Sequence, residues 1–404
     1  MRRRMSRLSA IPLTITLCAT GALCLPTAHA ADPTTDPTAM ETEHAQLSRQ
    51  LATQGMVLLE NDGKALPMAS KGNVAVYGVG SYKTVKGGTG SGAVNNRYNV
   101  SVRDGLEKAG YSITTSDAYY QAMKKAYDDK YLASEGNLFG ATVDYSSVEQ
   151  LLTSDTVKPT APTNTAIYVV ARNSGEGADR SSGKGDYLLS DTERADLTML
   201  GKQYRNVVVV LNTGGIIDTT FFKQVNSKVR DPKGGKALDA MLLMSQAGQE
   251  GGSALVDVLN GTVAPSGKLT DTWASAYRYY PASETIAKND GDSMTENYDE
   301  GIYVGYRWFD SKYKSLNAYQ PASVVNYPFG YGLGYSTFRT DAQQVSADMS
   351  TVTIKAKVTN TGKYAGRKSS RSTSPRPPQA STSHIRSSRA TRRPTCSSPG
   401  SRRW

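Results

Sequence analysis

The chain has 404 residues and a formal net charge of +11, a balance that on its own would suggest a nucleic-acid or membrane partner. The charge is concentrated at the two ends: residues 1–30 hold four Arg and no acid, and residues 367–404 hold ten Arg or Lys and no acid. Removing these fourteen charges from +11 leaves −3 for residues 31–366. The basic balance is therefore no evidence for a nucleic-acid partner, and we predict none.

Cysteine and histidine are nearly absent from residues 31–366. The cysteines Cys18, Cys24 and Cys396 all lie outside this range, which excludes disulfides and thiolate metal sites within it. Only His44 remains of the three histidines, on a predicted helix and exposed, so neither a Ser–His pair nor a histidine metal cluster is expected. We predict no metal and no cofactor. Carboxylates are left for acid, base or nucleophile chemistry.

Residues 1–30 have the pattern of a signal peptide. Four Arg precede an apolar run from Ile11 to Leu25, and Ala28-His29-Ala30 follows as a small-x-small cleavage site. We predict cleavage after Ala30 and a secreted, extracellular protein. No later stretch approaches about 20 apolar residues, so no membrane span is expected after cleavage.

Between residues 31 and 275 the patterns of strands and helices alternate. Thr38 and Glu41 predict a capping box and a helix that ends at Gly55. Short runs rich in β-branched residues predict strands covered on both faces, at 74–77, 166–171, 207–211 and 240–244. Helical patterns fall at 102–108, 118–126, 191–203 and 253–260. This alternation predicts an α/β fold: a doubly wound, mostly parallel α/β sandwich.

The remaining chain changes character twice. Residues 276–340 form a Tyr-rich, turn-rich stretch, which we predict to be a connecting segment on the surface. Residues 341–366 contain the alternation Val352, Ile354, Ala356, Val358, which predicts a half-buried strand at the start of a β domain.

Residues 367–404 are rich in Ser, Arg, Pro and Thr, without any acid, and we predict them to be disordered. They could be a basic binding arm. Because the change is abrupt, we favour the hypothesis of a shifted reading frame: one choice of codons for 367–375 encodes an alternating apolar strand in another frame. The gene sequence tests this.

A loop follows the strand at 166–171, and ligands bind outside the carboxyl ends of strands in open α/β sheets. The loop contains Glu176 between two glycines, which leave its carboxyl accessible. From the pattern alone, Glu176 is either a solvated loop residue or a reactive acid. Asp179 and Arg180 next to it suggest a local ion pair that holds the loop.

A second glycine-rich loop spans residues 78–92, after the strand at 74–77. A dinucleotide fingerprint requires a glycine where Lys83 stands, and no P-loop motif occurs, so nucleotide binding is weakly supported. Lys86, with the hydroxyls and amides around it, could instead hold a ligand rich in hydroxyl groups.

Taken together, seven strings resemble the family 3 glycoside hydrolases, the β-glucosidase-like family. They run in the family's order: GMVLLEN (55–61), KGGTGSG (86–92), SGEGADR (174–180), GQEGG (248–252), PSGKL (265–269), EGIYVGYR (300–307) and PFGYGL (328–333). The resemblance implies an α/β sandwich followed by a fibronectin type III-like domain, whose start would be residues 341–366.

The resemblance also implies roles for the loop residues. Glu176 matches the acid/base of a retaining mechanism, and Lys86, Thr89, Ser91 and Arg180 match positions that bind the substrate, an oligosaccharide or β-glucoside. In this family the nucleophile is an Asp on a TIM barrel. No barrel pattern occurs in this sequence, so we expect no nucleophile in this chain, which resembles the front half of a member with reversed domain order.

We therefore expect a glycoside hydrolase fragment that is inactive alone, with a barrel domain supplied in trans or encoded downstream. Two other functions stay open. The chain could be a non-catalytic carbohydrate-binding or assembly module that a separate barrel chain completes. It could also be a flavodoxin-like nucleotide binder, against which the glycine pattern argues.

Overall fold

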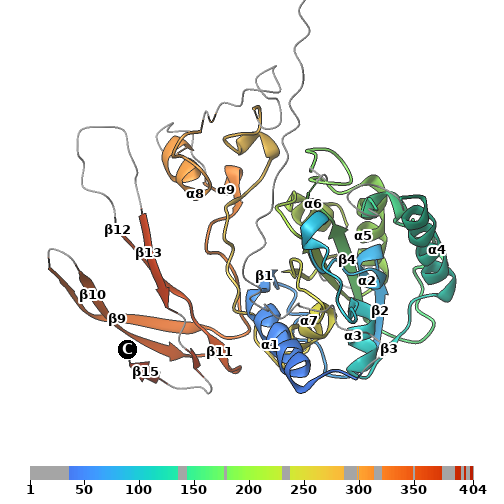
Figure 1. Cartoon of the computed structure of the whole chain (residues 1–404), viewed down its shortest axis with the longest axis horizontal. Helices are drawn as coiled ribbons and strands as arrows, with labels where there is room; N and C mark the ends of the chain where they lie inside the picture. Colours follow the sequence, from blue (N-terminus) through green and yellow to red (C-terminus); the bar gives the residue numbers. More distant parts are fainter. Residues whose placement is uncertain are drawn as a thin grey trace, which may run out of the picture.

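The computed structural model describes most of the chain: residues 36–134, 143–176, 180–229, 237–285, 298, 300–313, 321–348, 351–374, 387–392, 395–396 and 401–403. A six-stranded sheet lies at its centre, in the order β1-β6-β5-β4-β2-β3 (Figure 1). The strands are β1 (Val57–Glu60), β2 (Gly72–Tyr77), β3 (Tyr111–Ile113), β4 (Thr165–Arg172), β5 (Asn206–Thr213) and β6 (Ala240–Leu243). All neighbours pair in parallel except β1, which is antiparallel to β6.

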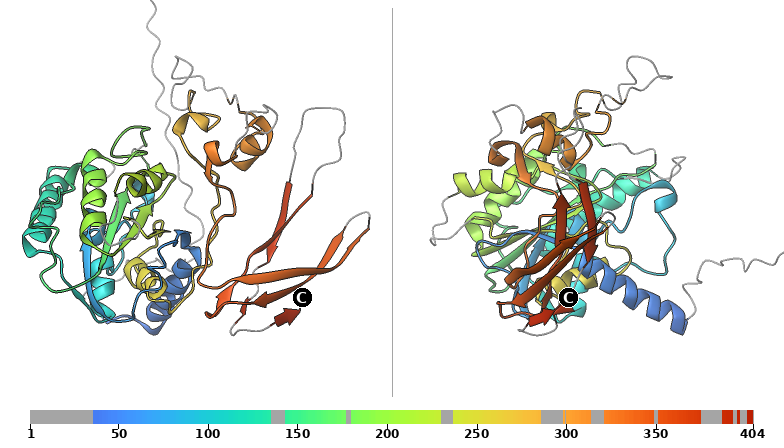
Figure 2. Two further views of the ribbon diagram at one scale, coloured as in Figure 1. Left: turned by 180° about the vertical axis from the view of Figure 1, so that it is seen from behind. Right: turned by 90° about the vertical axis from the view of Figure 1, so that its left-hand side faces the viewer.

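Helices cover both faces of the sheet, as Figure 2 shows with α1 and α7 on one side and the green helices on the other. One face carries α1 (Ala39–Gly55), α3 (Val102–Lys108) and α7 (Gly251–Leu259). The other carries α4 (Asp117–Ser134), α5 (Asp191–Gln203) and α6 (Thr220–Lys228). A short helix, α2 (Val79–Tyr82), follows β2, and 3-10 turns occur at Gly90–Gly92, Tyr145–Val148 and Tyr277–Tyr279.

The two hydrophobic cores follow from the alternation of side chains along each strand. In β4, Tyr168 and Val170 pack into the core under α4, α5 and α6, whereas Ile167 and Val169 pack under α3 and α7. All four are fully buried. Continuous apolar runs are therefore what a sheet covered on both faces requires.

The predicted doubly wound α/β sandwich is confirmed. The four predicted strands are β2, β4, β5 and β6, and the capping boxes at Thr38 and Ser190 form as expected. The helices at 102–108 and 191–203 have the predicted bounds, while α4 extends further than predicted, to Ser134. The sequence patterns missed β1 and β3, which are four and three residues long, and also the nine-residue helix α6.

The Tyr-rich segment lies between two paired strands. β7 (Trp273–Ala274) is antiparallel to β8 (Val325–Tyr327), and between them lie α8 (Tyr306–Trp308), a π-helical turn (Phe309–Tyr313) and α9 (Pro321–Val324). Aromatic contacts join this segment to the α/β body: the rings of Tyr187 and Tyr277 meet edge to face at 5.3 Å between centroids.

Beyond the sandwich, β9 (Phe338–Ala347) and β10 (Val352–Asn360) form a long antiparallel ribbon. Val358 is buried as predicted, but Val352 and Ile354 are exposed, so only the second half of β10 is half-buried. In the described residues no second sheet packs on the first half. The fibronectin type III-like assignment stays a prediction, as do the domain boundaries.

The sequence predicts disorder for residues 367–404, but the described parts of this tail form strands. These are β11 (Gly366–Arg367), β12 (Ser370–Ser374), β13 (Ser387–Arg392), β14 (Thr395–Cys396) and β15 (Ser401–Arg403). β12 pairs with β13, β11 with β14, and β15 with the edge of β10. Strand pairing uses backbone amides and carbonyls, which polar residues supply as well as apolar ones do. The composition of residues 367–404 therefore did not exclude strand pairing.

We expect the close approach of α3 to α7 to depend on Gly105. A Cβ at this position would lie 2.5 Å from the backbone carbonyl of Gly252, which cannot move away as a side chain can. Gly105→Ala should therefore lower the free energy of unfolding by about 1–3 kcal/mol. The control is Gly55→Ala at the end of α1, where nothing lies within 4 Å of the added methyl group. Urea denaturation of both variants tests this, and equal stability would contradict it.

Candidate functional site

The parallel pairing of β2 with β4 brings two loops together at the carboxyl edge of the sheet. Tyr77 near the end of β2 is in register with Tyr168 of β4. The chain after β2 passes through α2 into the glycine-rich loop, and the chain after β4 enters the loop that contains Glu176. An isolated bridge between Thr89 and Gly175 joins the two loops.

Glu176 is exposed, but its carboxylate is held by Ser91. The backbone amide of Ser91 donates to Oε2 at 2.9 Å, and the Ser91 hydroxyl donates to Oε1 at 2.6 Å. The hydroxyl of Thr89 donates to the backbone carbonyl of Glu176 at 3.3 Å, and the Thr89 amide donates to the carbonyl of Ser174 at 3.2 Å. Three predicted site residues, Glu176, Thr89 and Ser91, are thus in contact.

The close approach of the two loops requires glycine at residue 90. Gly90 has a φ of +66°, and a Cβ there would collide with the carboxyl of Glu176. On the opposite loop, a Cβ at Gly175 would collide with the backbone of Thr89. Gly90 and Gly175 thus allow the two loops to approach each other closely. In a nucleotide-binding loop, glycines would instead allow the backbone to approach a phosphate.

The hydrogen bonds from Ser91 favour the ionised carboxylate, and they lower the pKa of Glu176 below its ordinary value. Its exposure adds little opposing desolvation. No second carboxylate among the described residues contributes to this shift. In this state Glu176 is a carboxylate that can accept a proton, and it is a poor proton donor at neutral pH.

Lys86 lies at the start of the same loop but makes different contacts. Its ammonium group donates to the backbone carbonyl of Val94 and to the side chain of Asn96. Partial burial lowers its pKa. Lys86 therefore fixes the segment just after the glycine-rich loop, and among its hydrogen bonds to described residues none reaches Glu176.

Arg180 forms an ion pair with Asp186. The predicted pair with Asp179 lies outside the described residues. The side chain of Asp186 also accepts from the backbone amide of Ser181, and Nη1 of Arg180 donates to the carbonyl of Ile216 at 3.2 Å. Arg180 thus holds the returning half of the Glu176 loop against the segment after β5.

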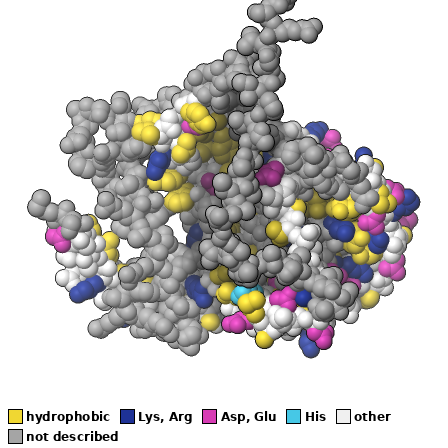
Figure 3. All heavy atoms as spheres, in the orientation of Figure 1, with side chains coloured by type: hydrophobic (Ala, Val, Ile, Leu, Met, Phe, Trp, Pro, Cys, Tyr) yellow, Lys and Arg dark blue, Asp and Glu magenta, His cyan; other side chains and the backbone are white. Residues whose placement is uncertain are grey.

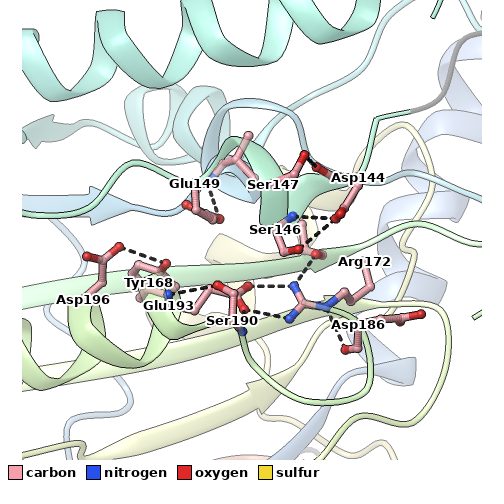
Figure 4. Close-up of polar contacts among 12 residues, drawn as sticks. Asp144, Ser146, Ser147, Glu149, Tyr168, Arg172, Asp186, Ser190, Glu193 and Asp196 are labelled. Carbon is pink, nitrogen blue, oxygen red and sulfur yellow. Dashed lines mark hydrogen bonds and ion pairs between the residues drawn. The ribbon is translucent and has the colours of Figure 1, made fainter. Parts of the chain in front are cut away.

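Sequence reasoning missed a group of buried charged side chains around Arg172, where this loop begins (Figure 4). Arg172, the last residue of β4, makes a bidentate ion pair with Glu193 in the first turn of α5, with N–O distances of 2.7 and 2.8 Å. Asp196 and Glu149 lie near the pair. A signal was present: Arg172 ends an apolar strand run, and a buried Arg requires a partner.

The acids of this group differ in their protonation. Burial and the nearby Glu193 raise the pKa of Glu149 well above its ordinary value, although Glu149 accepts from the amide of Val79 at 2.9 Å. Burial raises the pKa of Asp196 to about 7, against hydrogen bonds from the Leu152 amide and the Tyr168 hydroxyl. Glu193 faces the guanidinium of Arg172 in the salt bridge described above.

A polar groove of about 520 Å³ lies apart from Glu176, between α1 and the loops at 95–98 and 249–250. Its charges are already paired: Arg97 with Glu41 at 2.9 Å, and the hydroxyl of Tyr98 with Glu250 at 2.6 Å. His44, exposed on α1 as predicted, also lines it, and histidine colour is visible at the surface in Figure 3. The groove therefore adds no reactive group to the candidate site.

The described residues contain neither a metal-binding cluster nor a membrane-spanning helix. No group of three or more His, Cys, Asp or Glu side chains there could hold a metal ion. Within the same ranges, no helix is both long and apolar enough to cross a membrane.

Comparisons with known proteins agree on one family. Residues 56–306 match the model of the glycosyl hydrolase family 3 C-terminal domain. The chain is 32% identical over 366 residues to β-glucosidase A of Butyrivibrio fibrisolvens, covering 80% of this chain and 41% of the relative. It is 34% identical over 330 residues to a β-glucosidase of Ruminococcus albus, covering 80% of this chain and 32% of that protein.

The fold agrees with a solved structure of the same kind. β-Glucosidase 3B of Thermotoga neapolitana, in complex with glucose, superposes with a TM-score of 0.76 at 28% identity, covering 90% of this chain and 48% of that one. The chain thus spans less than half the length of each of these three proteins.

We expect Ser91 to be the cause of the lowered pKa of Glu176. In Ser91→Ala the hydroxyl donor is lost and only the backbone amide remains, so the pKa of Glu176 should rise towards the ordinary value of about 4.3. NMR titration of ¹³C-carboxyl-labelled Glu measures it, with the Glu176 signal assigned by its loss in Glu176→Gln. Thr84→Ala, which removes a hydroxyl elsewhere in the same region, is the control. An unchanged pKa in Ser91→Ala would contradict the assignment.

We also expect Asp196 to make stability depend on pH. Its folded-state pKa of about 7 exceeds the ordinary 3.8, so between these values the folded chain binds more protons than the unfolded one. Stability should therefore fall as pH rises from about 4 to about 7. Asp196→Asn cannot ionise and keeps an oxygen for the Leu152 amide.

The advantage of Asp196→Asn over the parent chain should grow with pH, by at most about 4 kcal/mol. Urea denaturation at pH 4.5 and pH 8 measures this difference. Because Glu149 titrates in both proteins, its contribution largely cancels. A stability difference that is the same at both pH values would show that Asp196 ionises normally in the folded chain.

Proposed function

The chain belongs to glycosyl hydrolase family 3, whose C-terminal domain it carries, and on this premise we propose that it supplies the acid/base carboxylate for retaining hydrolysis of β-glucosides. Glu176 is that carboxylate. The observation that carries the proposal is its position: Glu176 lies accessible at the carboxyl edge of the sheet, where open α/β folds bind ligands, and Ser91 holds its oxygens in place.

The proposed chemistry has two steps. In the first, protonated Glu176 donates its proton to the glycosidic oxygen while a second carboxylate attacks the anomeric carbon, so the leaving alcohol departs and a glycosyl ester forms. In the second, ionised Glu176 takes a proton from water, whose oxygen attacks the same carbon and releases the second carboxylate. The two carboxyl groups must lie about 5 Å apart for this to work.

We further propose that the second carboxylate comes from a barrel domain outside this chain, in trans or encoded downstream. The relatives named above are more than twice as long as the part that this chain matches. The state of Glu176 supports the same view. Its lowered pKa suits the base of the second step but not the acid of the first. A covering domain and a bound substrate would remove water from the Glu176 carboxyl and so raise its pKa.

The other predicted binding residues receive narrower roles. Thr89 and Ser91 act on Glu176 itself, since their hydrogen bonds end on its backbone and its carboxylate. Lys86 and Arg180 fix the two loops through Asn96 and Asp186. We propose that these four residues shape the site, and that the sugar ring is bound mainly by the domain that carries the nucleophile.

We also propose that the chain is exported, because residues 1–30 combine clustered Arg, an apolar run and a small-residue cleavage site. This segment lies outside the described residues. The proposed substrate, an oligosaccharide or β-glucoside, is consistent with an extracellular site of action.

The chain assayed alone should not hydrolyse an aryl β-glucoside, because it lacks the nucleophile. Mixed with the part of the Butyrivibrio β-glucosidase that it does not match, it should become active. Glu176→Gln should then lower kcat by about 10²–10⁴-fold. Glu43→Gln, an exposed acid on α1, is the control.

Release of the aryl alcohol measures activity, and sedimentation velocity measures assembly. Turnover by the chain alone that Glu176→Gln abolishes would overturn the proposed need for a second domain. A stable but inactive mixture would favour a carbohydrate-binding or assembly module instead.

A further inference from the structure

We propose that the buried Arg172–Glu193 pair is the positioning device of the Glu176 loop: a single guanidinium joins the start, the middle and the end of residues 172–193 and so keeps the Glu176 carboxylate against Ser91. The inference rests on the proposed function only for the use of Glu176 as acid/base. Neither Arg172 nor Glu193 touches the reacting atoms, so both are positioning residues.

The guanidinium of Arg172 reaches three parts of the chain at once. It makes the bidentate contact with Glu193 in α5, and its Nε donates to the backbone carbonyl of Asp186 at 2.9 Å. Nη1 also donates to the carbonyl of Ala171 at 2.8 Å. Arg172 is 4% exposed. A planar group with five donors can make all these contacts together, and an ammonium cannot.

Glu193 closes the far end of the loop with the same carboxylate. Its Oε2 accepts from the backbone amide of Ser190 at 2.7 Å, and the hydroxyl of Ser190 accepts from the Glu193 amide at 3.2 Å. This capping box starts α5. Glu193 has no exposed surface. Glu193, in the first turn of α5, therefore both caps the helix and pairs with Arg172 at the end of β4, so one carboxylate joins the two ends of residues 172–193.

The middle of the loop is attached to this stem through Asp186. Arg172 binds its backbone carbonyl, and the Asp186 side chain in turn binds Arg180 and the amide of Ser181. A series of contacts thus leads from Glu193 through Arg172 and Asp186 to Arg180 and Ser181, on the C-terminal side of Glu176. Loss of the Arg172–Glu193 pair should therefore weaken the hydrogen bonds between Ser91 and Glu176.

The second loop of the site is supported from the same buried group. Glu149 accepts from the amide of Val79, the first residue of α2, and α2 leads into the loop that contains Ser91. Burial raises the pKa of Glu149, whereas Arg172 and Glu193 form a salt bridge. The same buried group thus contacts the start of both loops, Arg172 at the end of β4 and Val79 at the start of α2.

A simpler explanation is that the pair only stabilises the fold. Replacing both members of a buried ion pair by apolar residues often leaves stability unchanged or improves it, whereas removing one member is costly. The double variant Arg172→Met/Glu193→Leu therefore separates the two explanations. It removes the contacts to Asp186 and Ser190 without leaving a buried charge unpaired.

The test is the carboxyl titration of Glu176 by ¹³C NMR in the full chain. If the pair positions the loop, the pKa of Glu176 in the double variant should rise to near its value in Ser91→Ala. In Arg172→Lys, which keeps the charge but not the planar set of donors, the rise should be partial. The double variant is expected to stay folded in thermal denaturation.

The matched control is Arg49→Met. Arg49 forms an equally short bidentate pair with Asp257, at 2.6 and 2.7 Å, but it joins α1 to α7 away from Glu176. This variant should lose stability and leave the titration of Glu176 unchanged. If Arg49→Met moves the titration as far as the double variant does, the effect is general destabilisation and the proposal is wrong.

A folded double variant in which Glu176 titrates as in the parent chain would also overturn the positioning proposal. If the double variant does not fold, Arg172→Lys decides: a parental titration there overturns the proposal, and a raised pKa supports it. Because the titration needs neither a barrel nor turnover, its result is independent of whether Glu176→Gln affects hydrolysis, and the two proposals can fail separately.

Discussion

The candidate site depends on the parallel pairing of β2 with β4. Parallel neighbours end at the same edge of a sheet, so the chain segments that follow them start side by side. Here the register Tyr77 to Tyr168 brings the glycine-rich loop and the Glu176 loop to one edge. The Thr89–Gly175 bridge and the Ser91–Glu176 hydrogen bonds are consequences of that pairing. An antiparallel neighbour would have placed the two loops at opposite ends of the sheet.

The carboxyl edge is also where the fold buries charge. A strand covered on both faces offers no polar surroundings, so a guanidinium at its end is stable only with an anionic partner and carbonyl acceptors. The start of α5 supplies them, because its first turn provides Glu193 and the preceding loop provides the carbonyl of Asp186. The loop that carries the exposed Glu176 thus starts at a buried salt bridge whose two charged groups pair with each other.

The fold was predictable from the sequence to the extent that it rests on long periodic segments. β4, β5 and α5 are continuous patterns with clear caps, and they occur where predicted. β1 and β3 are four and three residues long, and their assignment depends on neighbours that a local pattern does not contain. β10 was predicted to be half-buried throughout, but whether Ile354 is covered depends on a second sheet and not on its own alternation.

The site was predictable in its residues but not in its contacts. The family strings indicated Glu176, Lys86, Thr89, Ser91 and Arg180, and all five lie in the two loops at the carboxyl edge. The sequence could not show that Ser91 binds Glu176 while Lys86 binds Asn96. Ser91 and Lys86 are polar residues of the same loop, and their partners depend on the path of the backbone. Arg172, Glu149 and Asp196 were missed. Arg172 could have been found, because it ends an apolar strand run, whereas Glu149 and Asp196 are buried by neighbours distant in the sequence.

The protonation of Glu176 depends both on its contacts within this chain and on its exposure to water. The proposed role requires Glu176 both to give and to take a proton, which needs a pKa close to the working pH, but the two hydrogen bonds from Ser91 lower its pKa. Because Glu176 is exposed, little desolvation opposes this shift. Covering the loop edge with a second domain would oppose it, because desolvation raises the pKa of a carboxyl and excludes competing water. If the proposed role is right, the Ser91 hydrogen bonds prepare Glu176 for the base step, and covering that edge of the sheet would prepare it for the acid step.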